Sequence, residues 1–518
     1  MINHDSGNTT SIWMVAPGAP LTVPLSEHMT VDVCVVGAGI AGLTTAYMLC
    51  REGRLVAVLD DGQIGGGETS RTTAHLVNAL DRRYSDLENL HGRSGARRAA
   101  ESHTAAIDRI EAIVAAEKIA CDFERLDGYL FAPPGESTEV LDKELDAAHR
   151  AGLTQVSRVA RAPIASFETG PCLRFPRQAQ FHPLKYLYAL ARAIQSRGGK
   201  LFTGTHAEKI EAGPPGQVTT TRGPIVRSTS ILVATNSPVN DIVRVHTKQA
   251  AYRSYVIGAR VPKGSVTTAL YWDTADPFHY VRLQKEDDHE VLIVGGEDHK
   301  TGQADDSSDR FNRLEQWMRQ RFARAGTTEY RWSGQVMESI DGLAFIGSNS
   351  ALEPNIYIAT GDSGNGMTHG TIAGILLTDL IQGRDNDWKT LYDPARIRFG
   401  AAAEFAKENL NVMAQYSDYV TGGERNSPEE IGAGEGAIIQ DGLTKIAVSR
   451  DANGVLHEMS AVCPHLGCIV AWNPTEKTWD CPCHGSRFDA SGKVVNGPAI
   501  TGLAPTAQPS AFSRARVS

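Results

Sequence analysis

The chain has 518 residues, of which 41% are hydrophobic and 21% charged, a composition typical of a globular protein with about three domains. Its formal charge of −9, from 51 basic and 60 acidic residues, and the lack of a Lys/Arg block argue against nonspecific binding to nucleic acid. Residues 1–10 are mostly polar and lack the basic start of a secretory signal, so we expect a cytoplasmic protein.

The most apolar window, residues 31–49, interrupts its hydrophobic run with Asp32 and three glycines. A membrane helix needs about 20 predominantly apolar residues, so we predict no membrane span. The window divides better into a buried parallel strand over residues 31–36, a glycine turn, and a helix from Leu43. Residues 1–29, which precede it, carry three prolines, and we expect them to form an arm on the surface.

The glycine turn has the spacing of a dinucleotide-binding motif, Gly37-Ala-Gly39-Ile-Ala-Gly42. A second strand over residues 55–59 ends at Asp60. Glycines in such a turn let a pyrophosphate approach the helix N-terminus, and the acid at the strand end can hold a ribose hydroxyl. The pattern predicts binding of FAD or NAD through Gly37, Gly39, Gly42 and Asp60, with a purely structural glycine turn as the alternative.

Residues 65–76, Gly-Gly-Gly-Glu-Thr-Ser-Arg-Thr-Thr-Ala-His-Leu, favour FAD. They resemble the stretch after the second strand in the D-amino acid oxidase superfamily, which includes sarcosine, glycine and gamma-glutamylputrescine oxidoreductases. The resemblance implies cofactor contacts from Ser70 and Arg71 and places His75 near the flavin, although a lone histidine is more often a packing residue. Arg71 stands where one branch of the superfamily has a flavin-linking histidine, so noncovalent FAD is expected.

The middle of the chain contains elements expected from the same resemblance. Helices are predicted over 99–117 and 139–151 and strands over 123–132, 200–203 and 231–236, with Ala207 where the family's backbone meets the adenine. Alternating strands at 254–260, 269–273, 279–283 and 290–294 resemble the antiparallel sheet that roofs the flavin. Its candidate catalytic residues are Tyr255, His279, Tyr280 and Arg282, with Tyr252 and Arg253 as further candidates; alternation alone does not tell which face each occupies.

A second glycine-rich turn precedes a helix predicted over 370–381. It resembles the superfamily's loop under the flavin, where helix N-terminal amides favour negative charge on the reduced ring. The resemblance implies contacts from Gly361, Gly366, Met367 and Thr368. No second GxGxxG occurs, so no NAD(P)H site is expected. The expected FAD-binding segments are 30–98, 171–249 and 332–394, and the substrate-domain segments are 99–170 and 250–331.

Residues 395–430 are predicted to be a linker helix and hinge, and 431–518 a small β domain with strands at 437–440, 444–449 and 456–461. This domain contains two loops, Cys463-Pro-His465-Leu-Gly-Cys468 and Cys481-Pro-Cys483-His484-Gly-Ser486. Two cysteines and two histidines can hold a tetrahedral zinc ion or a [2Fe–2S] cluster. The four other cysteines, Cys34, Cys50, Cys121 and Cys172, are expected to be buried free thiols.

The two loops resemble those of the Rieske proteins of cytochrome bc complexes. The resemblance implies Cys463, His465, Cys481 and His484 as cluster ligands and a disulfide between Cys468 and Cys483. Ser486 matches a hydroxyl donor to a cluster sulfur, Phe488 replaces the family's tyrosine, and Gly497-Pro498-Ala499 resembles its proline loop. Electron exit from the cluster implies that both ligand histidines have an edge near solvent.

The predicted fold is therefore α/β plus all-β: a Rossmann-like FAD-binding domain, an inserted antiparallel-sheet substrate domain and a C-terminal Rieske domain. We expect FAD-dependent oxidation of an amine or amino acid, with electrons relayed singly through the [2Fe–2S] cluster to an unidentified acceptor. The alternatives are an oxygen-using amine oxidase with a structural or sensing cluster, an electron-transfer flavoprotein without an organic substrate, and electron flow from cluster to flavin. The oligomeric state is left open.

Overall fold

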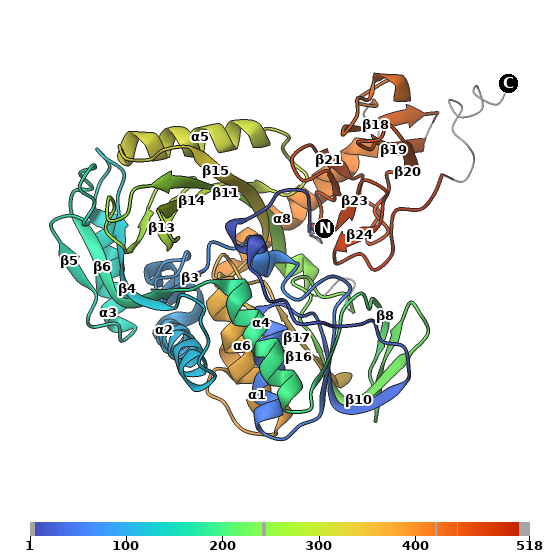
Figure 1. Ribbon diagram of the computed structural model, residues 1–518, viewed down its shortest axis with the longest axis horizontal. Helices are drawn as coiled ribbons and strands as arrows, with labels where there is room; N and C mark the ends of the chain where they lie inside the picture. Colours follow the sequence, from blue (N-terminus) through green and yellow to red (C-terminus); the bar gives the residue numbers. More distant parts are fainter. Residues whose placement is uncertain (1–5, 241–244, 420–421, 443, 507–518) are drawn as a thin grey trace.

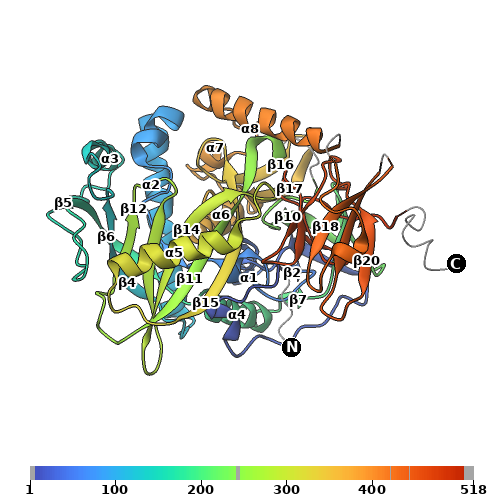
Figure 2. The ribbon, with the colours of Figure 1, turned by 90° about the horizontal axis from the view of Figure 1, so that it is seen from above.

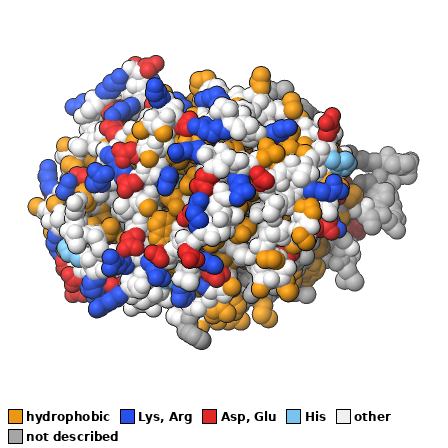
Figure 3. Space-filling model, turned by 90° about the horizontal axis from the view of Figure 1, so that it is seen from below, with side chains coloured by type: hydrophobic (Ala, Val, Ile, Leu, Met, Phe, Trp, Pro, Cys, Tyr) orange, Lys and Arg blue, Asp and Glu red, His pale blue; other side chains and the backbone are white. Residues whose placement is uncertain are grey.

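The computed structural model describes residues 6–240, 245–419, 422–442 and 444–506. Figure 1 shows two large sheet-containing layers, with a small β domain beside both of them. Within the described residues, no helix is both long enough and apolar enough to cross a membrane. In Figure 3, acidic and basic side chains are interspersed over the face shown.

The first layer is a mainly parallel sheet in the order β16-β17-β10-β1-β2-β7. Its strands are β1 (Met29–Val36), β2 (Val56–Leu59), β7 (Lys200–Phe202), β10 (Ile225–Val233), β16 (Phe345–Ser350) and β17 (Glu353–Thr360), and β8 (Ala207–Glu211) and β9 (Gly216–Thr220) extend it from β10. Helices α1 (Ile40–Arg51), α4 (Pro183–Ser196) and α6 (Gly366–Ile381) pack together beside it. At the centre of the sheet, β2 and residues 33–36 of β1 are apolar and buried, as in a parallel sheet covered on both faces.

The second layer is a sheet in the order β15-β11-β14-β13-β12-β4-β6-β3, with β5 beside β6. Its strands are β3 (His75–Leu76), β4 (Glu124–Phe131), β5 (Ser157–Val159), β6 (Cys172–Gln180), β11 (Gln249–Val261), β12 (Leu270–Asp273), β13 (His279–Lys285), β14 (Glu290–Lys300) and β15 (Thr328–Ser339). The β4–β12 pair is parallel and the other pairs are antiparallel. Because β6 and most of β15 belong to this sheet, the expected boundaries at 171 and 332 differ from the strand pairing.

Helices cover the outer parts of the second layer. Helix α5 (Ser307–Arg321) contacts β11 and β14, as Figure 2 shows from above. Helix α2 (Tyr84–Ala116) bends at Gly92, whose φ of 70° interrupts the helix, and packs against α3 (Glu139–Arg150) and α6. Shorter elements are η2 (Glu68–Arg71), η3 (His246–Lys248), α7 (Lys389–Tyr392) and η4 (Phe399–Ala401).

The C-terminal domain contains two small antiparallel sheets. One consists of β18 (Gly436–Asp441), β19 (Thr444–Arg450) and β20 (Leu456–Ser460), and the other of β21 (Ala471–Asn473), β22 (Thr478–Asp480), β23 (Arg487–Asp489) and β24 (Val494–Asn496). The connection to this domain contains α8 (Ala402–Gln415), η5 (Tyr416–Tyr419) and η6 (Pro428–Glu430). Lys300 of β14 and Glu408 of α8 form an ion pair at 2.6 Å, which connects the linking helix to the sheet of the second layer.

The N-terminal arm lies partly in the interior, contrary to the expected surface position. Trp13, in η1 (Ile12–Val15), is 0% exposed, and its indole nitrogen donates to the carbonyl of Thr72 at 2.6 Å. The Ser11 hydroxyl donates to the carbonyl of Ser70 at 2.6 Å. A surface arm is wrong for this segment because Trp13 can bury its large ring there while its N–H retains a partner.

Candidate functional site

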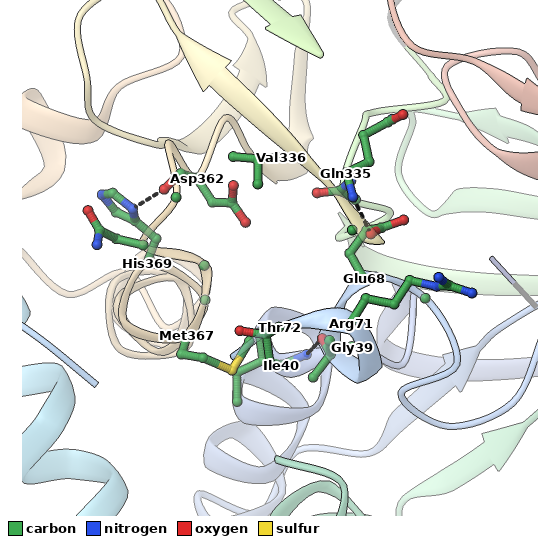
Figure 4. Close-up of a pocket in the computed structure, with 18 of the residues that line it drawn as sticks. Gly39, Ile40, Glu68, Arg71, Thr72, Gln335, Val336, Asp362, Met367 and His369 are labelled. Atoms are coloured by element: carbon green, nitrogen blue, oxygen red, sulfur yellow. Dashed lines mark hydrogen bonds between the residues drawn. The ribbon is translucent and has the colours of Figure 1, made fainter. Parts of the chain in front are cut away.

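A cavity of about 410 Å³ lies where the first sheet, the second sheet and the C-terminal domain meet. Figure 4 shows its wall formed by the glycine turn before α1, the start of α6 and strand β15. The glycine turn packs closely against the neighbouring strand. Gly37 has a φ of 109°, and a Cβ there would overlap the carbonyl of Ala234. Such a turn keeps the backbone open to a pyrophosphate at the helix N-terminus.

The residues expected to bind the nucleotide fall into two groups. Gly37, Gly39, Asp60 and Ala207 line the cavity. Asp60 also accepts hydrogen bonds from the amides of Ala38 and Gly62, at 2.6 and 2.8 Å. Gly42 is not among the lining residues; it allows the close approach of α1 to the carbonyl of Gly37.

The segment after the second strand is arranged differently from the expectation. Ser70 does not line the cavity, and its hydroxyl donates to the carbonyl of Gly67 at 2.8 Å. The neighbouring Thr69 instead accepts from the amide of Ile40, at 3.2 Å, beside the helix N-terminus. Arg71 lines the cavity, but its guanidinium points away from it, as Figure 4 shows, and pairs with Glu476 at 3.1 Å. The guanidinium of Arg71 is therefore not directed at the expected cofactor site, because its counter-charge, Glu476, belongs to the C-terminal domain.

The second glycine-rich turn contributes two of its four expected contacts to the cavity wall. Gly366 and Met367, at the start of α6, line it. Gly361 and Thr368 do not: Gly361 lies against Gln249 and Phe345, and the Thr368 hydroxyl bonds to His103 at 2.9 Å. Both residues lie outside the cavity wall and hold the glycine-rich turn through these contacts.

Of the candidate catalytic residues, His75 and Tyr280 line the cavity. His75 bonds to the Thr73 hydroxyl at 3.0 Å, and burial together with Arg282 lowers the pKa of its imidazole to about 3. Its ring lies edge-on to Tyr280, with the centroids 5.8 Å apart. The Tyr280 hydroxyl bonds to Ser254 at 2.6 Å.

Tyr255, His279 and Arg282 do not line the cavity, so the structure does not bring them together with His75 and Tyr280. Tyr255 stacks on His299 behind the sheet, whereas its neighbours Ser254 and Val256 face the cavity. His279 stacks on Trp317 of α5 and pairs with Asp273 at 3.1 Å. Arg282 donates to three backbone carbonyls and holds the segment around Ala74 in place. The registers of β11 and β13 decide these faces, and the alternating pattern does not determine them.

Several further carboxylic acids line the cavity, and four of them act on one another electrostatically. This group, called the acid cluster below, comprises Asp81 after β3, Asp298 of β14, Glu338 of β15 and Asp362 after β17. Asp81 is open to the cavity, and the other three are half-buried beside it. A second group on the wall, the aromatic wall below, comprises Trp272, Phe278 and Tyr280.

The cysteine and histidine loops come together in the C-terminal domain. Cys463 and Cys481 are buried and not disulfide-bonded, and their thiols lie within hydrogen-bond reach of each other. Backbone amides of His465 and Leu466 point at the Cys463 sulfur, and those of Cys483 and His484 point at the Cys481 sulfur. Amides directed at a sulfur stabilise a thiolate ligand.

Histidine and disulfide geometry complete a set of donors that fits a [2Fe–2S] cluster. The rings of His465 and His484 lie edge to face with centroids 5.1 Å apart, and the buried Nδ1 of His484 has no hydrogen-bond partner among the described residues. Cys468 and Cys483 form the expected disulfide, with a Cα–Cα distance of 6.4 Å. The buried Ser486 hydroxyl accepts from the amide of Ala499 at 3.0 Å, which leaves its own proton available to a sulfur.

The histidine edge expected to face solvent is covered instead. His484 is 5% exposed. His246 of η3, which is 1% exposed, has its ring centroid 5.1 Å from that of His465 and 6.4 Å from that of His484. The prediction is wrong for His484 because η3 of the nucleotide-binding part packs against the cluster loops.

The C-terminal domain also forms part of the cavity wall, through Val494, Val495, Asn496, Gly497 and Ala499. Asn496 donates to Glu68 at 3.1 Å, and the other oxygen of Glu68 accepts from the amide of Gln335 at 2.6 Å, as Figure 4 shows. The Gln335 side chain in turn donates to the carbonyl of Gly485, next to His484, at 2.9 Å. One residue of β15 thus contacts both the cavity and the cluster loop.

A buried group of charges, called the interface network below, fixes the two parts to each other. Glu476 pairs with Arg71 at 3.1 Å and lies 3.9 Å from Arg253. Asp480 lies 3.6 Å from Arg253 and 3.2 Å from Arg487. Burial alone would raise the pKa of Glu476, but the three arginines outweigh it and lower the pKa to about 2. Arg253, a substrate-binding candidate on sequence grounds, therefore has a role in the domain contact.

Comparisons with known proteins agree with this architecture. Residues 32–380 match the FAD dependent oxidoreductase family, described as DAO, and residues 425–507 match the Rieske [2Fe-2S] domain. A Bacillus subtilis protein described as a putative Rieske 2Fe-2S iron-sulfur protein, YhfW, is 32% identical over 95% of this chain and 96% of its own length. Gamma-glutamylputrescine oxidoreductase of Escherichia coli is 27% identical over 69% of this chain and 85% of its own.

Solved structures confirm the fold of the larger part. Glycine oxidase from Geobacillus kaustophilus superposes with a TM-score of 0.61 at 15% identity, covering 71% of this chain and 99% of its own. The cofactors that these two matched regions imply are FAD and a [2Fe–2S] cluster, and the cavity and the donor set described above fit them. The chain belongs to the FAD dependent oxidoreductase family of D-amino acid oxidase type, with a Rieske [2Fe–2S] domain in its C-terminal part.

Proposed function

We propose that this protein is an amine dehydrogenase that passes electrons from its flavin site to its own Rieske domain and then to an external one-electron acceptor. The observation that carries the proposal is the shared wall: the Rieske segment 494–499 lines the cavity, and Gln335 joins that cavity to the cluster loop. A cluster used only for structure would need no contact with the flavin cavity.

The two cofactors supply complementary chemistry when bound. FAD takes two electrons and a hydrogen from the carbon next to an amine nitrogen, and a Rieske cluster carries one electron at a time. The imine that remains reacts with water to give a carbonyl compound and an amine or ammonia. We assign the FAD cradle to Gly37, Gly39, Asp60, Gly366 and Met367, and the cluster to Cys463, His465, Cys481 and His484.

The acid cluster provides a group that can prepare the substrate. An amine must lose its ammonium proton before the carbon next to nitrogen is oxidised. Desolvation in the cavity and the neighbouring carboxyl groups raise the pKa of Asp81 to about 7, and desolvation and Glu68 raise that of Asp362 to about 7. A carboxylate with a pKa near neutrality is a suitable acceptor for the ammonium proton of the substrate. His75, with its lowered pKa, stays neutral and acts as a hydrogen-bonding group.

The contact between cluster loops and η3 supports a route inside one chain. His246 lies against both ligand rings, and Gln249, three residues later, accepts from the Thr360 hydroxyl at 3.0 Å at the end of β17. The second glycine-rich turn begins directly after Thr360. A short run of packed side chains therefore connects the cluster loops with the turn assigned to the flavin.

The proposal is tested by anaerobic reduction of the protein loaded with both cofactors. An amine substrate is expected to bleach the flavin first and then to produce the EPR signal of the reduced Rieske cluster. The Cys481→Ser variant, which loses one cluster ligand, serves as control and should show only the flavin change. A flavin that bleaches while a dithionite-reducible cluster stays oxidised would overturn the relay. Stoichiometric peroxide at the full turnover rate would favour the oxidase alternative.

A further inference from the structure

The acid cluster collects four carboxyl groups on one part of the cavity wall. The charges act on one another: Asp81, Asp362 and Asp298 all raise the pKa of Glu338. Among the described residues, no Lys, Arg or His forms an ion pair within 4.0 Å with any of the four. Four carboxyl groups without a paired cation form a region of the cavity that favours positive charge.

Two of these carboxyl groups are also incompletely hydrogen-bonded. Oδ1 of Asp298 and Oδ1 of Asp362 are buried and have no partner among the described residues. Figure 4 shows the Asp362 carboxylate pointing into the cavity, while its backbone carbonyl bonds to His369 at 2.8 Å. Buried polar oxygens are normally satisfied, so these two indicate a donor that the protein itself does not supply.

Positively charged side chains outside the acid cluster offset its negative charge only from a distance. Arg82 acts on Glu338, and Arg310 and His279 act on Asp298. Arg310 is engaged by Asp306 at 2.7 Å, and His279 by Asp273 at 3.1 Å. Desolvation prevails at both groups. Together with the other three acids it raises the pKa of Glu338 to about 8, and together with Glu297 it raises the pKa of Asp298 to about 6.

Among the described residues, the arginines that line the cavity lie close to carboxylates of the protein itself. Two arginines line it, Arg71 and Arg83. The guanidinium of Arg71 is held by Glu476, and Arg83 lies in the electrostatic range of Glu144. The other candidates, Arg253 and Arg282, are buried outside the cavity. A carboxylate-bearing amino acid would bring its negative charge to a wall with four acids.

The aromatic wall provides the complementary apolar contact. Tyr280 of this wall shares a hydrogen bond with Ser254, and Ser254 also contacts Asp298 of the acid cluster. Aromatic faces attract ammonium groups and cover methylene chains. The cavity thus combines sites for several positive charges with an apolar surface next to them.

We propose that the substrate is an aliphatic diamine or polyamine without a carboxylate, with its ammonium groups bound by the acid cluster and its methylenes by the aromatic wall. This rests on the proposed function and names its substrate class. Oxidation would take place at the carbon next to one amino group: the ammonium proton passes to a carboxylate of the acid cluster, the C–H bond breaks, and the hydrogen leaves with both bonding electrons to the bound FAD. Water then hydrolyses the imine to an aldehyde and an amine or ammonia. The remaining ammonium groups keep the substrate in place.

A matched set of four-carbon ligands tests the charge requirement directly. The FAD-loaded protein is mixed anaerobically with 1,4-diaminobutane, n-butylamine or 4-aminobutanoate, and flavin bleaching and calorimetric binding are both measured. We expect 1,4-diaminobutane to bind at least about tenfold more tightly than n-butylamine, and 4-aminobutanoate to bind most weakly, since one added charged hydrogen bond corresponds to about that factor. Equal or tighter binding of 4-aminobutanoate would overturn the inference.

The variants Glu338→Gln and Asp298→Asn keep the shape of the cluster and remove one charge each. Each should weaken 1,4-diaminobutane binding by about tenfold and n-butylamine binding much less. Asp305→Asn, which removes an exposed carboxylate before α5, is the control and should change neither. A uniform loss for both ligands in the cluster variants would show a merely structural role and contradict the proposal. FAD absorbance per protein verifies that the cavity is still formed.

Proton release on ligand binding gives an independent test of the proposed cation site. Because a bound polycation favours ionised carboxyl groups, 1,4-diaminobutane should expel protons at neutral pH, seen as different heats in phosphate and Tris buffers. If no ligand bleaches the flavin but 1,4-diaminobutane binds with proton release, the proposed oxidation fails while the cation site stands. If bleaching occurs with n-butylamine and the diamine binds no better, the oxidation stands and the polyamine inference fails.

Discussion

The side-chain amide of Gln335 donates a hydrogen bond to the carbonyl oxygen of Gly485 at 2.9 Å. Gln335 lines the flavin cavity, and Gly485 lies between His484 and Ser486 in the cluster loop. Its side chain is buried, so the hydrogen bond is shielded from water. One side chain thus contacts both the cavity of the oxidising part and the cluster loop of the electron-carrying part.

Replacing Gln335 by leucine removes this donor with little change in volume. The buried carbonyl of Gly485 then lacks a partner, which costs about 1–3 kcal/mol of domain docking. We expect flavin reduction by a substrate to stay within about twofold of wild type, a shift within about 0.4 kcal/mol, while cluster reduction slows by a larger factor. Stopped-flow absorbance and freeze-quench EPR measure the two steps. Gln316→Leu on the exposed side of α5 is the control; equal slowing in both variants would contradict a specific role.

Glu476 holds the centre of the interface network. The Glu476→Gln variant leaves Arg71 and Arg253 without their buried counter-charge, and breaking one partner of a buried pair costs about 3–5 kcal/mol. Urea unfolding followed by fluorescence should show this loss, whereas Glu136→Gln in an exposed turn should unfold like wild type. A loss below 1 kcal/mol, about the value of an exposed ion pair, would refute the assigned importance of the network.

The same carboxylate gives a pH dependence of defined sign. Its pKa is lowered to about 2 in the folded protein, below the ordinary carboxyl value. The stability that it contributes is therefore present above the ordinary carboxyl pKa of about 4.3 and is lost as pH falls toward 2. The difference in unfolding free energy between wild type and Glu476→Gln should shrink from pH 6 to pH 3. A difference that is constant over this range would contradict the lowered pKa.

The disulfide between Cys468 and Cys483 closes a loop with a sequence separation of 15 residues. A cross-link of that span stabilises a fold by about 3 kcal/mol. The double variant Cys468→Ser/Cys483→Ser should lose the cluster at a lower urea concentration, as measured by visible absorbance and EPR. Cys50→Ala, which removes a buried free thiol, is the control for general destabilisation. An unchanged urea midpoint for cluster loss in the double variant would show that the disulfide does not stabilise the cluster.

The sequence predicted the parts of the molecule that depend on local spacing. The glycine turn at Gly37 and the paired cysteine and histidine loops form as expected because neighbouring residues determine them, whereas α6 begins at Gly366, before the expected start at Gly370. The faces of Tyr255 and His279 were not predictable, since the alternation in β11 and β13 is the same whichever side faces the cavity.

Contacts between segments that are distant in sequence were the other feature that could not be predicted. Arg71 and Glu476 are 405 residues apart in sequence and meet only because the domains dock. The covering of His484 by His246 and the interior position of Trp13 depend on the same docking. The acid cluster combines residues from four separate segments of the chain, and only Asp362 lies within a motif, the second glycine-rich turn. Such sites arise from tertiary packing, and no window of sequence encodes them.

The cavity wall contributed by residues 494–499 also constrains how the protein matures. On the ribosome, the nucleotide-binding turn at Gly37 emerges long before this segment is synthesised. The cavity wall is therefore incomplete until the C-terminal segment has been synthesised and its domain has docked. A protein whose iron–sulfur domain failed to fold would lack this part of the wall, so the flavin cavity depends on the integrity of that domain.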